Sequence, residues 1–131
     1  MATDKSRGQS LLEFALTLPV FLWLVLGLFD LGRGVASYTV LSNSAREGAR
    51  AATIPLTSDA DVAAAVNSQT VILGTVPSGD ITIVPPVQSD RTSGKKITVE
   101  VRYRFQPVTP LVSNVVGSTI SMRATSTVTI E

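Results

Sequence analysis

The stretch RGQSLLEFALTLPVFLWLVLGLFDLGRG, residues 7–34, decides the fold of this chain of 131 residues. From residue 11 to residue 31 only Glu13, Thr17 and Asp30 interrupt an apolar run, in which Gly27 is a weak helix former. A helix of about 20 apolar residues, rising about 1.5 Å per residue, crosses a membrane hydrocarbon core about 30 Å thick. The run therefore predicts one membrane-spanning helix over residues 11–31.

The residues on either side of this run predict the orientation and the length of the helix. Lys5 and Arg7 precede the run, which predicts a cytoplasmic N-terminus by the positive-inside rule. After Pro19, which predicts a local kink, no proline follows until Pro55. Because a proline disfavours helical backbone in the residue before it, we expect one long helix over residues 9–54.

Residues 55–131 form the predicted globular head. A second helix is predicted over residues 57–69, since Thr57 or Ser58 can cap it and two aspartates occupy its first turn. Beyond this helix the hydrophobic period changes to two residues, which predicts three strands, over residues 81–84, 96–105 and 118–131. The segment 107–117, which contains two prolines, is predicted to connect the last two strands.

Each predicted strand has one apolar face, which is typical of an antiparallel sheet covered on one side. The expected cover is a stripe of small residues on the long helix, formed by Ser42, Ala45, Ala49 and Ala52. We expect this stripe to pack against Val99, Val101, Tyr103, Ile120 and Met122. The predicted fold class is α+β, with a long N-terminal helix packed on a small head that carries a short second helix and a three-stranded antiparallel sheet.

The composition argues against several functional classes. The chain contains no Cys and no His, so it lacks thiolates, the commonest general base and the commonest transition-metal ligand. The sequence also has no glycine-rich phosphate loop and no nucleophile elbow. A net charge of +1, without a basic patch interleaved with aromatics, does not favour nucleic acid as a partner. We therefore expect no enzyme activity and no catalytic, cofactor-binding or metal-binding residue.

Three interpretations of residues 1–36 compete. The apolar run could be a simple anchor that tethers a small domain to the membrane. It could also be a removable secretory signal, because Gly34-Val35-Ala36 before Ser37 resembles a cleavage site for signal peptidase. Against this second interpretation, the run is longer than the usual signal core of about 7–15 residues, and Glu13 interrupts it. The third interpretation rests on the spacing between Gly8 and that glutamate.

Glu13 is the fifth residue after Gly8, and Phe14 and Pro19 follow it inside the apolar helix. The segment RGQSLLEFAL, which begins at Arg7, resembles the class III signal of type IV pilins, and specifically that of the TadE-like branch of the tight-adherence (Tad) pilus system. The resemblance is strong over residues 7–34, and the remainder of the chain agrees with the family only in its order of elements.

This resemblance implies a structural function. A prepilin peptidase on the cytoplasmic face would cut between Gly8 and Gln9 and remove residues 1–8. Residues 11–31 would then form the core of a helical filament, a homo-oligomer or a co-assembly with other pilins, with Glu13, Phe14 and Pro19 as assembly residues. The precursor would lie in the cytoplasmic membrane, and the product in an extracellular pilus with roles in adhesion, surface colonisation or motility. The alternative is a single-pass accessory domain that does not polymerise.

The two acidic residues of the apolar run receive different interpretations. Cleavage would create an amine on Gln9, and Glu13 of a neighbouring subunit could neutralise it, which offsets the cost of burying either charge. Asp30 and Arg33 lie three residues apart near the outer interface, and they are expected to form a weak pair that marks the membrane exit.

Overall fold

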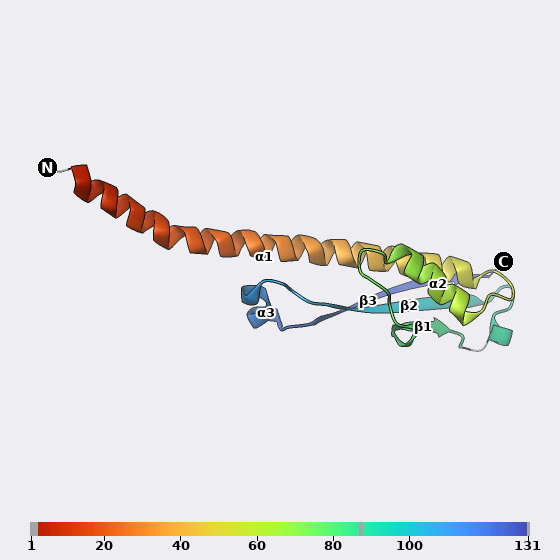
Figure 1. Cartoon of the computed structure of the whole chain (residues 1–131). Helices are drawn as coiled ribbons and strands as arrows, with labels where there is room; N and C mark the ends of the chain where they lie inside the picture. Colours follow the sequence, from red (N-terminus) through yellow and green to blue (C-terminus); the bar gives the residue numbers. More distant parts are fainter. Residues whose placement is uncertain (1–2, 87, 131) are drawn as a thin grey trace.

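The computed structural model describes residues 3–86 and 88–130, and it has the predicted α+β architecture (Figure 1). Its main elements, in chain order, are α1 (Thr3–Ala52), α2 (Asp59–Gln69), β1 (Ile81–Val84), β2 (Lys96–Phe105), α3 (Pro110–Val116) and β3 (Ile120–Thr129). Two short 3-10 turns, η1 (Ser78–Asp80) and η2 (Gln88–Asp90), flank β1. Residues 1–2 of the predicted leader and residue 131 of the predicted last strand lie outside the described residues.

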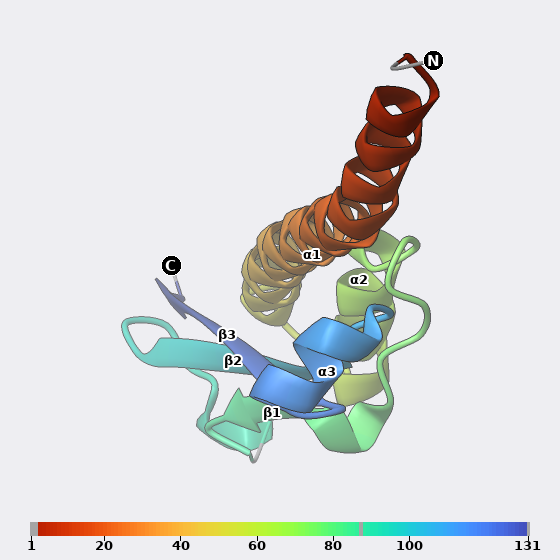
Figure 2. The same ribbon diagram turned by 90° about the vertical axis from the view of Figure 1, so that its left-hand side faces the viewer.

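The three strands form one antiparallel sheet in the order β1-β2-β3. Ile83 of β1 pairs with Val99 of β2, and Val101 of β2 pairs with Ala124 of β3. Figure 2 shows α1 and α2 together on one face of this sheet. The sheet is therefore covered on one side, as the alternation of apolar and polar residues predicts.

The core lies between the second half of α1, α2 and the sheet. Ala45 and Ala49 of the predicted stripe are fully buried, and they belong to one apolar cluster with Val99 and Val101. Tyr103 and Met122, which are partly buried, pack against the same cluster. Ile120 lies instead beside an apolar groove nearer the N-terminus of α1, so its predicted place against the alanines was wrong.

Gly48 explains how closely α2 approaches α1. A Cβ atom built on this glycine would lie 2.5 Å from Cγ2 of Val66 in α2 and 3.2 Å from Cγ1 of Val99 in β2. Because real Cβ atoms do not tolerate such approaches, a larger residue would force the two helices apart.

The start of α2 follows the predicted capping pattern. Ser58 is the N-cap, and its hydroxyl oxygen accepts a hydrogen bond from the backbone N–H of Asp61 at 3.2 Å. The carboxylate of Asp61 in turn accepts hydrogen bonds from the Ser58 backbone N–H and hydroxyl. This reciprocal arrangement is a capping box, and it satisfies donors that the first helical turn leaves without intrahelical partners.

The connection between β2 and β3 differs from its prediction. Residues 107–117 contain the short helix α3, in which Pro110 occupies the first turn. A proline is well tolerated there, because the first backbone N–H groups of a helix have no intrahelical acceptor. The segment is thus the predicted connection, but it contains a short helix that was not predicted.

Candidate functional site

The first half of α1 exposes a largely apolar surface. From Gly8 to Phe29 every side chain is exposed, apart from two half-buried positions at Val25 and Gly27. Phe14, Phe21 and Trp23 are each about 60 % exposed. We call residues 8–29 the bare segment, and Figure 1 shows that most of it projects beyond the head.

The bare segment has the composition of a membrane span. The helix from Gly8 to Ala52 is long and apolar enough to cross a membrane. A monomeric soluble protein rarely exposes a continuous apolar surface of this size, because the hydrophobic effect favours covering it. An apolar surrounding, lipid or the helices of other chains, is therefore its natural environment.

The predicted assembly residues lie together on the first turns of this segment. Nε2 of Gln9 donates a hydrogen bond to Oε1 of Glu13 at 3.2 Å, one helical turn away. The Thr17 hydroxyl donates to the backbone carbonyl oxygen of Glu13 at 2.8 Å. No ion pair is formed by Glu13 among the side chains that the structure describes, which exclude those of residues 1–7.

The backbone around the predicted cleavage point is helical. Helix α1 begins at Thr3 rather than at the predicted residue 9, so Gly8 lies within the helix as Gln9 does. A Cβ atom on Gly8 would meet no atom of the chain within 4 Å. The side chains of Lys5 and Arg7, on which the predicted orientation rests, lie outside the described residues.

Pro19 interrupts the hydrogen-bond pattern of α1 without ending the helix. Figure 1 shows α1 bending in its N-terminal part, which agrees with the predicted local kink. Phe14 and Pro19 are both exposed, so neither residue is needed to hold the head.

Asp30 has a larger role than the predicted weak pair. It is 4 % exposed, and Nη1 of Arg33 donates a hydrogen bond to its Oδ1 at 2.8 Å. The same carboxylate accepts the backbone N–H of Val108 at 3.1 Å and that of Thr109 at 2.7 Å. The Thr109 hydroxyl donates to the carbonyl oxygen of Leu26 at 3.2 Å. These contacts fasten the loop before α3 to the end of the bare segment.

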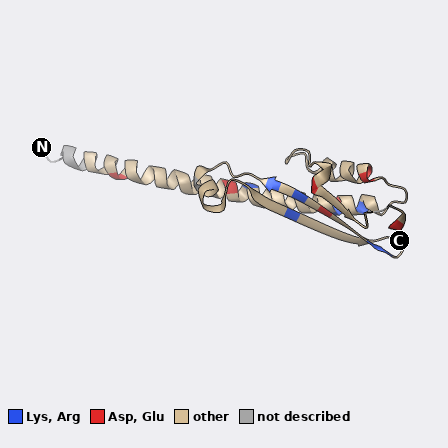
Figure 3. Cartoon of the chain, turned by 90° about the horizontal axis from the view of Figure 1, so that it is seen from below, with Lys and Arg blue, Asp and Glu red and all other residues tan. Residues whose placement is uncertain are grey.

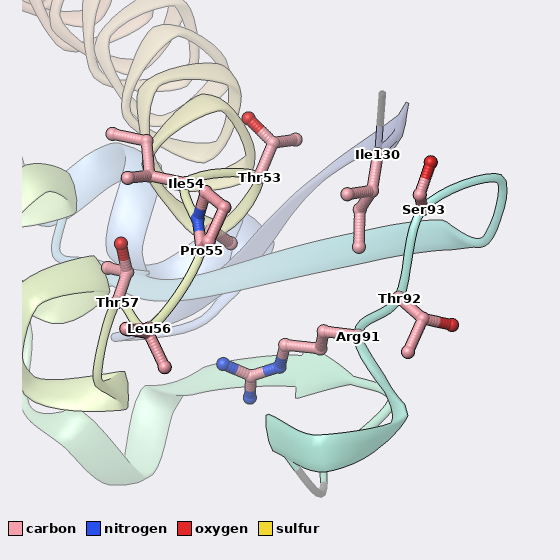
Figure 4. Close-up of a pocket in the computed structure, with 10 residues that line it drawn as sticks. Thr53, Ile54, Pro55, Leu56, Thr57, Arg91, Thr92, Ser93 and Ile130 are labelled. Atoms are coloured by element: carbon pink, nitrogen blue, oxygen red, sulfur yellow. The ribbon is translucent and has the colours of Figure 1, made fainter.

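The head has a hollow of mixed polar and apolar lining at the far end of α1, drawn in Figure 4. Arg91 reaches across it, and its Nη2 donates to Oδ1 of Asp59 at 2.6 Å while its Nε donates to the Pro85 carbonyl oxygen at 3.3 Å. The Arg91 side chain is 4 % exposed. Its bond to Asp59 joins the loop after η2 to the start of α2. Throughout residues 3–86 and 88–130, no group of three or more acidic residues could hold a metal ion.

Comparison with known proteins supports the assignment of the first helix. The family model of TadE-like proteins matches residues 8–50. This segment is TadE-like. Neither the curated proteins nor the solved structures contain a match to the chain.

The TadE-like match covers nearly all of α1 and stops before α2. It includes both the bare segment and the part of the helix that packs on the head. Together with the apolar surface, it fits a Tad pilus-associated protein that is associated with a membrane. Sequence reasoning missed the Asp30 contacts and α3, although the uncharged run from Phe105 to Met122 was a visible signal.

Proposed function

We propose that the chain is a structural subunit of a Tad-type pilus, a pilin or a minor pilin-like protein, that polymerises through α1 after cleavage between Gly8 and Gln9. The observation that carries this proposal is the bare segment, which begins with the spaced Gly8–Glu13 motif and makes few contacts with the head. In the precursor, lipid covers this surface. In the filament, the helices of neighbouring subunits replace the lipid.

Glu13 sets how neighbouring subunits align along the filament. Cleavage leaves a charged amine on Gln9, one helical turn from the Glu13 carboxylate. In a helical filament the amine of one subunit lies near the first turn of its neighbour. A buried charge without a partner is strongly unfavourable, so pairing the amine with a neighbouring Glu13 penalises a slipped subunit. Phe14 and Pro19, exposed on the same segment, would then pack against neighbouring helices.

Processing is tested by the N-terminus of protein isolated from its native host. A mature chain that starts at Gln9 supports the proposal, and Gly8→Val should block cutting because the scissile bond then carries a branched side chain. Gly32→Val is the matched control, since a Cβ on Gly32 also meets no atom within 4 Å. An intact Met1 would favour the accessory domain that does not polymerise, and a start at Ser37 would favour a secreted domain.

Assembly is tested by Glu13→Gln, which keeps the shape of the side chain and removes its charge. The precursor should insert and fold normally, because the head lies far along α1 from residue 13. Filament yield should fall sharply, since the Gln9 amine would lose its counter-charge. Glu47→Gln is the control, because Glu47 lies on the same helix and pairs locally with Arg50. Normal filaments from Glu13→Gln would show that the carboxylate is not the assembly contact.

A further inference from the structure

The tip of the head around α3 is uncharged and exposes several valines. Between Arg104 and Arg123 the sequence contains no Asp, Glu, Lys or Arg. Val108 and Val115 are 75 % and 78 % exposed, and Val116 is also exposed. A soluble protein rarely leaves neighbouring apolar side chains exposed in this way, so the patch is a candidate contact surface.

The position of this tip along α1 is fixed by its hydrogen bonds. Asp30 binds the backbone N–H groups of Val108 and Thr109, and the Thr109 hydroxyl reaches the carbonyl oxygen of Leu26. Cγ2 of Val112 in α3 would lie 3.9 Å from a Cβ on Gly27. Helix α3 therefore lies beside the last turns of the predicted membrane span rather than beside the middle of the head (Figure 1).

The apolar surface of α3 continues the apolar surface of α1. Leu28 and Leu31 are exposed on α1 at the height of α3, and the groove between the two helices is lined by Gly27, Leu31, Val35, Val112 and Val116. An apolar cover on Leu31 and Val35 would therefore also contact Val112 and Val116, which line the same groove. Figure 3 shows α3 itself without charged residues, although an acidic position of α1 lies beside it; most of the other charged residues lie on the sheet, α2 and the loops of the head.

Two further features suit an apolar surrounding. Backbone N–H groups without partners are unfavourable in hydrocarbon, and Asp30 satisfies those of Val108 and Thr109 before α3 begins. The flanking arginines Arg33, Arg104 and Arg123 are each more than half exposed on their side chains. Long arginine side chains at this level can reach the headgroup region while their apolar stems lie against the surface.

We propose that the exposed valines of α3 and of the turn before it enter the hydrocarbon of the membrane leaflet on the side of the head, as a second membrane contact beside α1. The occupant of the patch is phospholipid, and the contact sets the depth of α1 and limits rotation of the head about it. This inference rests on the membrane association of the bare segment and is independent of cleavage and polymerisation.

The experiment uses the full chain in nanodiscs of phosphatidylcholine and phosphatidylglycerol that hold one copy each. Because the chain contains no Cys, a single cysteine carries a polarity-sensitive fluorophore at Val115→Cys, with Leu16→Cys as the lipid reference and Leu56→Cys as the water reference. Leu16 is 69 % exposed within the bare segment, and Leu56 is 95 % exposed beyond the far end of α1. Val115 should resemble Leu16, with strong quenching by spin-labelled lipid and severalfold weaker quenching by iodide than Leu56.

A paired substitution tests whether protection of the label depends on the apolar side chain of Val116. Val116→Asn, which adds no charge that would repel iodide, should raise iodide quenching of the label at residue 115 severalfold, whereas Val71→Asn, at another exposed valine of the head, should leave it unchanged. Equal iodide quenching at residues 115 and 56 in single-copy discs would overturn the proposal. Protection of residue 115 only in discs with several copies would also overturn it, because a second subunit would then cover the patch.

Discussion

The two ends of α1 are parts of one continuous helix, yet they present different apolar residues. The bare segment carries large side chains, such as Phe21, Trp23 and Leu24, that the head does not cover. The covered segment, which we define as residues 37–52, turns small residues such as Ala45 and Ala49 to the head and charged residues to solvent. A helix that is apolar on all sides is stable only in an apolar surrounding, whereas a helix with one apolar stripe can bury that stripe against a sheet and leave its other faces in water.

The difference in residue size follows from what covers each part. Small residues let the sheet and α2 approach the backbone of α1 closely, and Gly48 is the extreme case. Large residues in the bare segment present a wide apolar surface, which suits an apolar surrounding. The residues between the two segments contain Asp30, which binds the loop before α3 through two backbone N–H groups.

The largest expected contrast comes from the same substitution in both segments. Leu41→Ala removes a fully buried leucine, which should destabilise the head by about 2–5 kcal/mol. Leu24→Ala removes a leucine that is 68 % exposed, and the stability of the head should stay unchanged. Thermal unfolding of the full chain in detergent micelles, followed by circular dichroism, measures both. Equal shifts in Tm would mean that the bare segment also contributes to folding of the head.

A second contrast uses the glycines. Gly48→Ala should destabilise the head, because overpacking at roughly 1–3 kcal/mol exceeds the gain of about 1 kcal/mol in helix propensity. Gly32→Ala should be neutral or slightly stabilising, since nothing lies within 4 Å of its Cβ. The same unfolding measurement applies to both variants. A higher Tm for Gly48→Ala would show that α2 can move away without loss.

Local sequence patterns were sufficient to predict the strands, from their period of two, and the long helix, from its apolar run and the absence of proline between Pro19 and Pro55. The alternation that begins at Lys96 appears as β2, and the stripe of Ala45 and Ala49 faces the sheet. Each of these patterns shows which face of an element is buried, and it can be read from residues that lie close together in the sequence. The strand pairing follows because strands with one apolar face must share the same cover.

Contacts between distant residues could not be predicted in this way. The bonds from Asp30 go to backbone groups 78 and 79 residues away, and any residue could supply them. The role of Gly48 depends on the path of α2, which periodicity does not specify. The prediction of Glu13 as an assembly residue depends on other subunits, so a single chain leaves it a prediction.

Asp30→Asn should loosen the join between the two segments and leave the rest of the head intact. An asparagine offers one acceptor oxygen, so one of the N–H groups of Val108 and Thr109 would face an amide donor. Hydrogen exchange at these two positions should become about tenfold faster, as expected for a buried donor without an acceptor. Glu47→Gln is the matched control. Unchanged exchange would mean that the carboxylate does not hold the loop.

The smallest expected effect concerns the capping box of α2, the helix that packs against the covered segment of α1. Ser58→Ala removes the cap hydroxyl and should destabilise the head by about 0.5–2 kcal/mol. Ser68→Ala changes another exposed serine of α2, away from the cap, and should have a smaller effect. Equal losses from the two variants would mean that the capping box adds no stability.

The pH dependence of this effect separates the two halves of the box. The hydrogen bonds from the Ser58 hydroxyl and backbone N–H hold the pKa of Asp61 below its ordinary value. A lowered pKa in the folded state means that the ionised carboxylate stabilises the fold above about pH 4, where an unfolded aspartate is ionised. This contribution disappears as the pH falls through the folded pKa. The difference in Tm between the natural chain and Ser58→Ala should therefore narrow in acid, but not vanish, because the bond from the Asp61 N–H to the Ser58 hydroxyl does not titrate. A difference that stays constant down to about pH 2 would show that the charge of Asp61 contributes nothing through this serine.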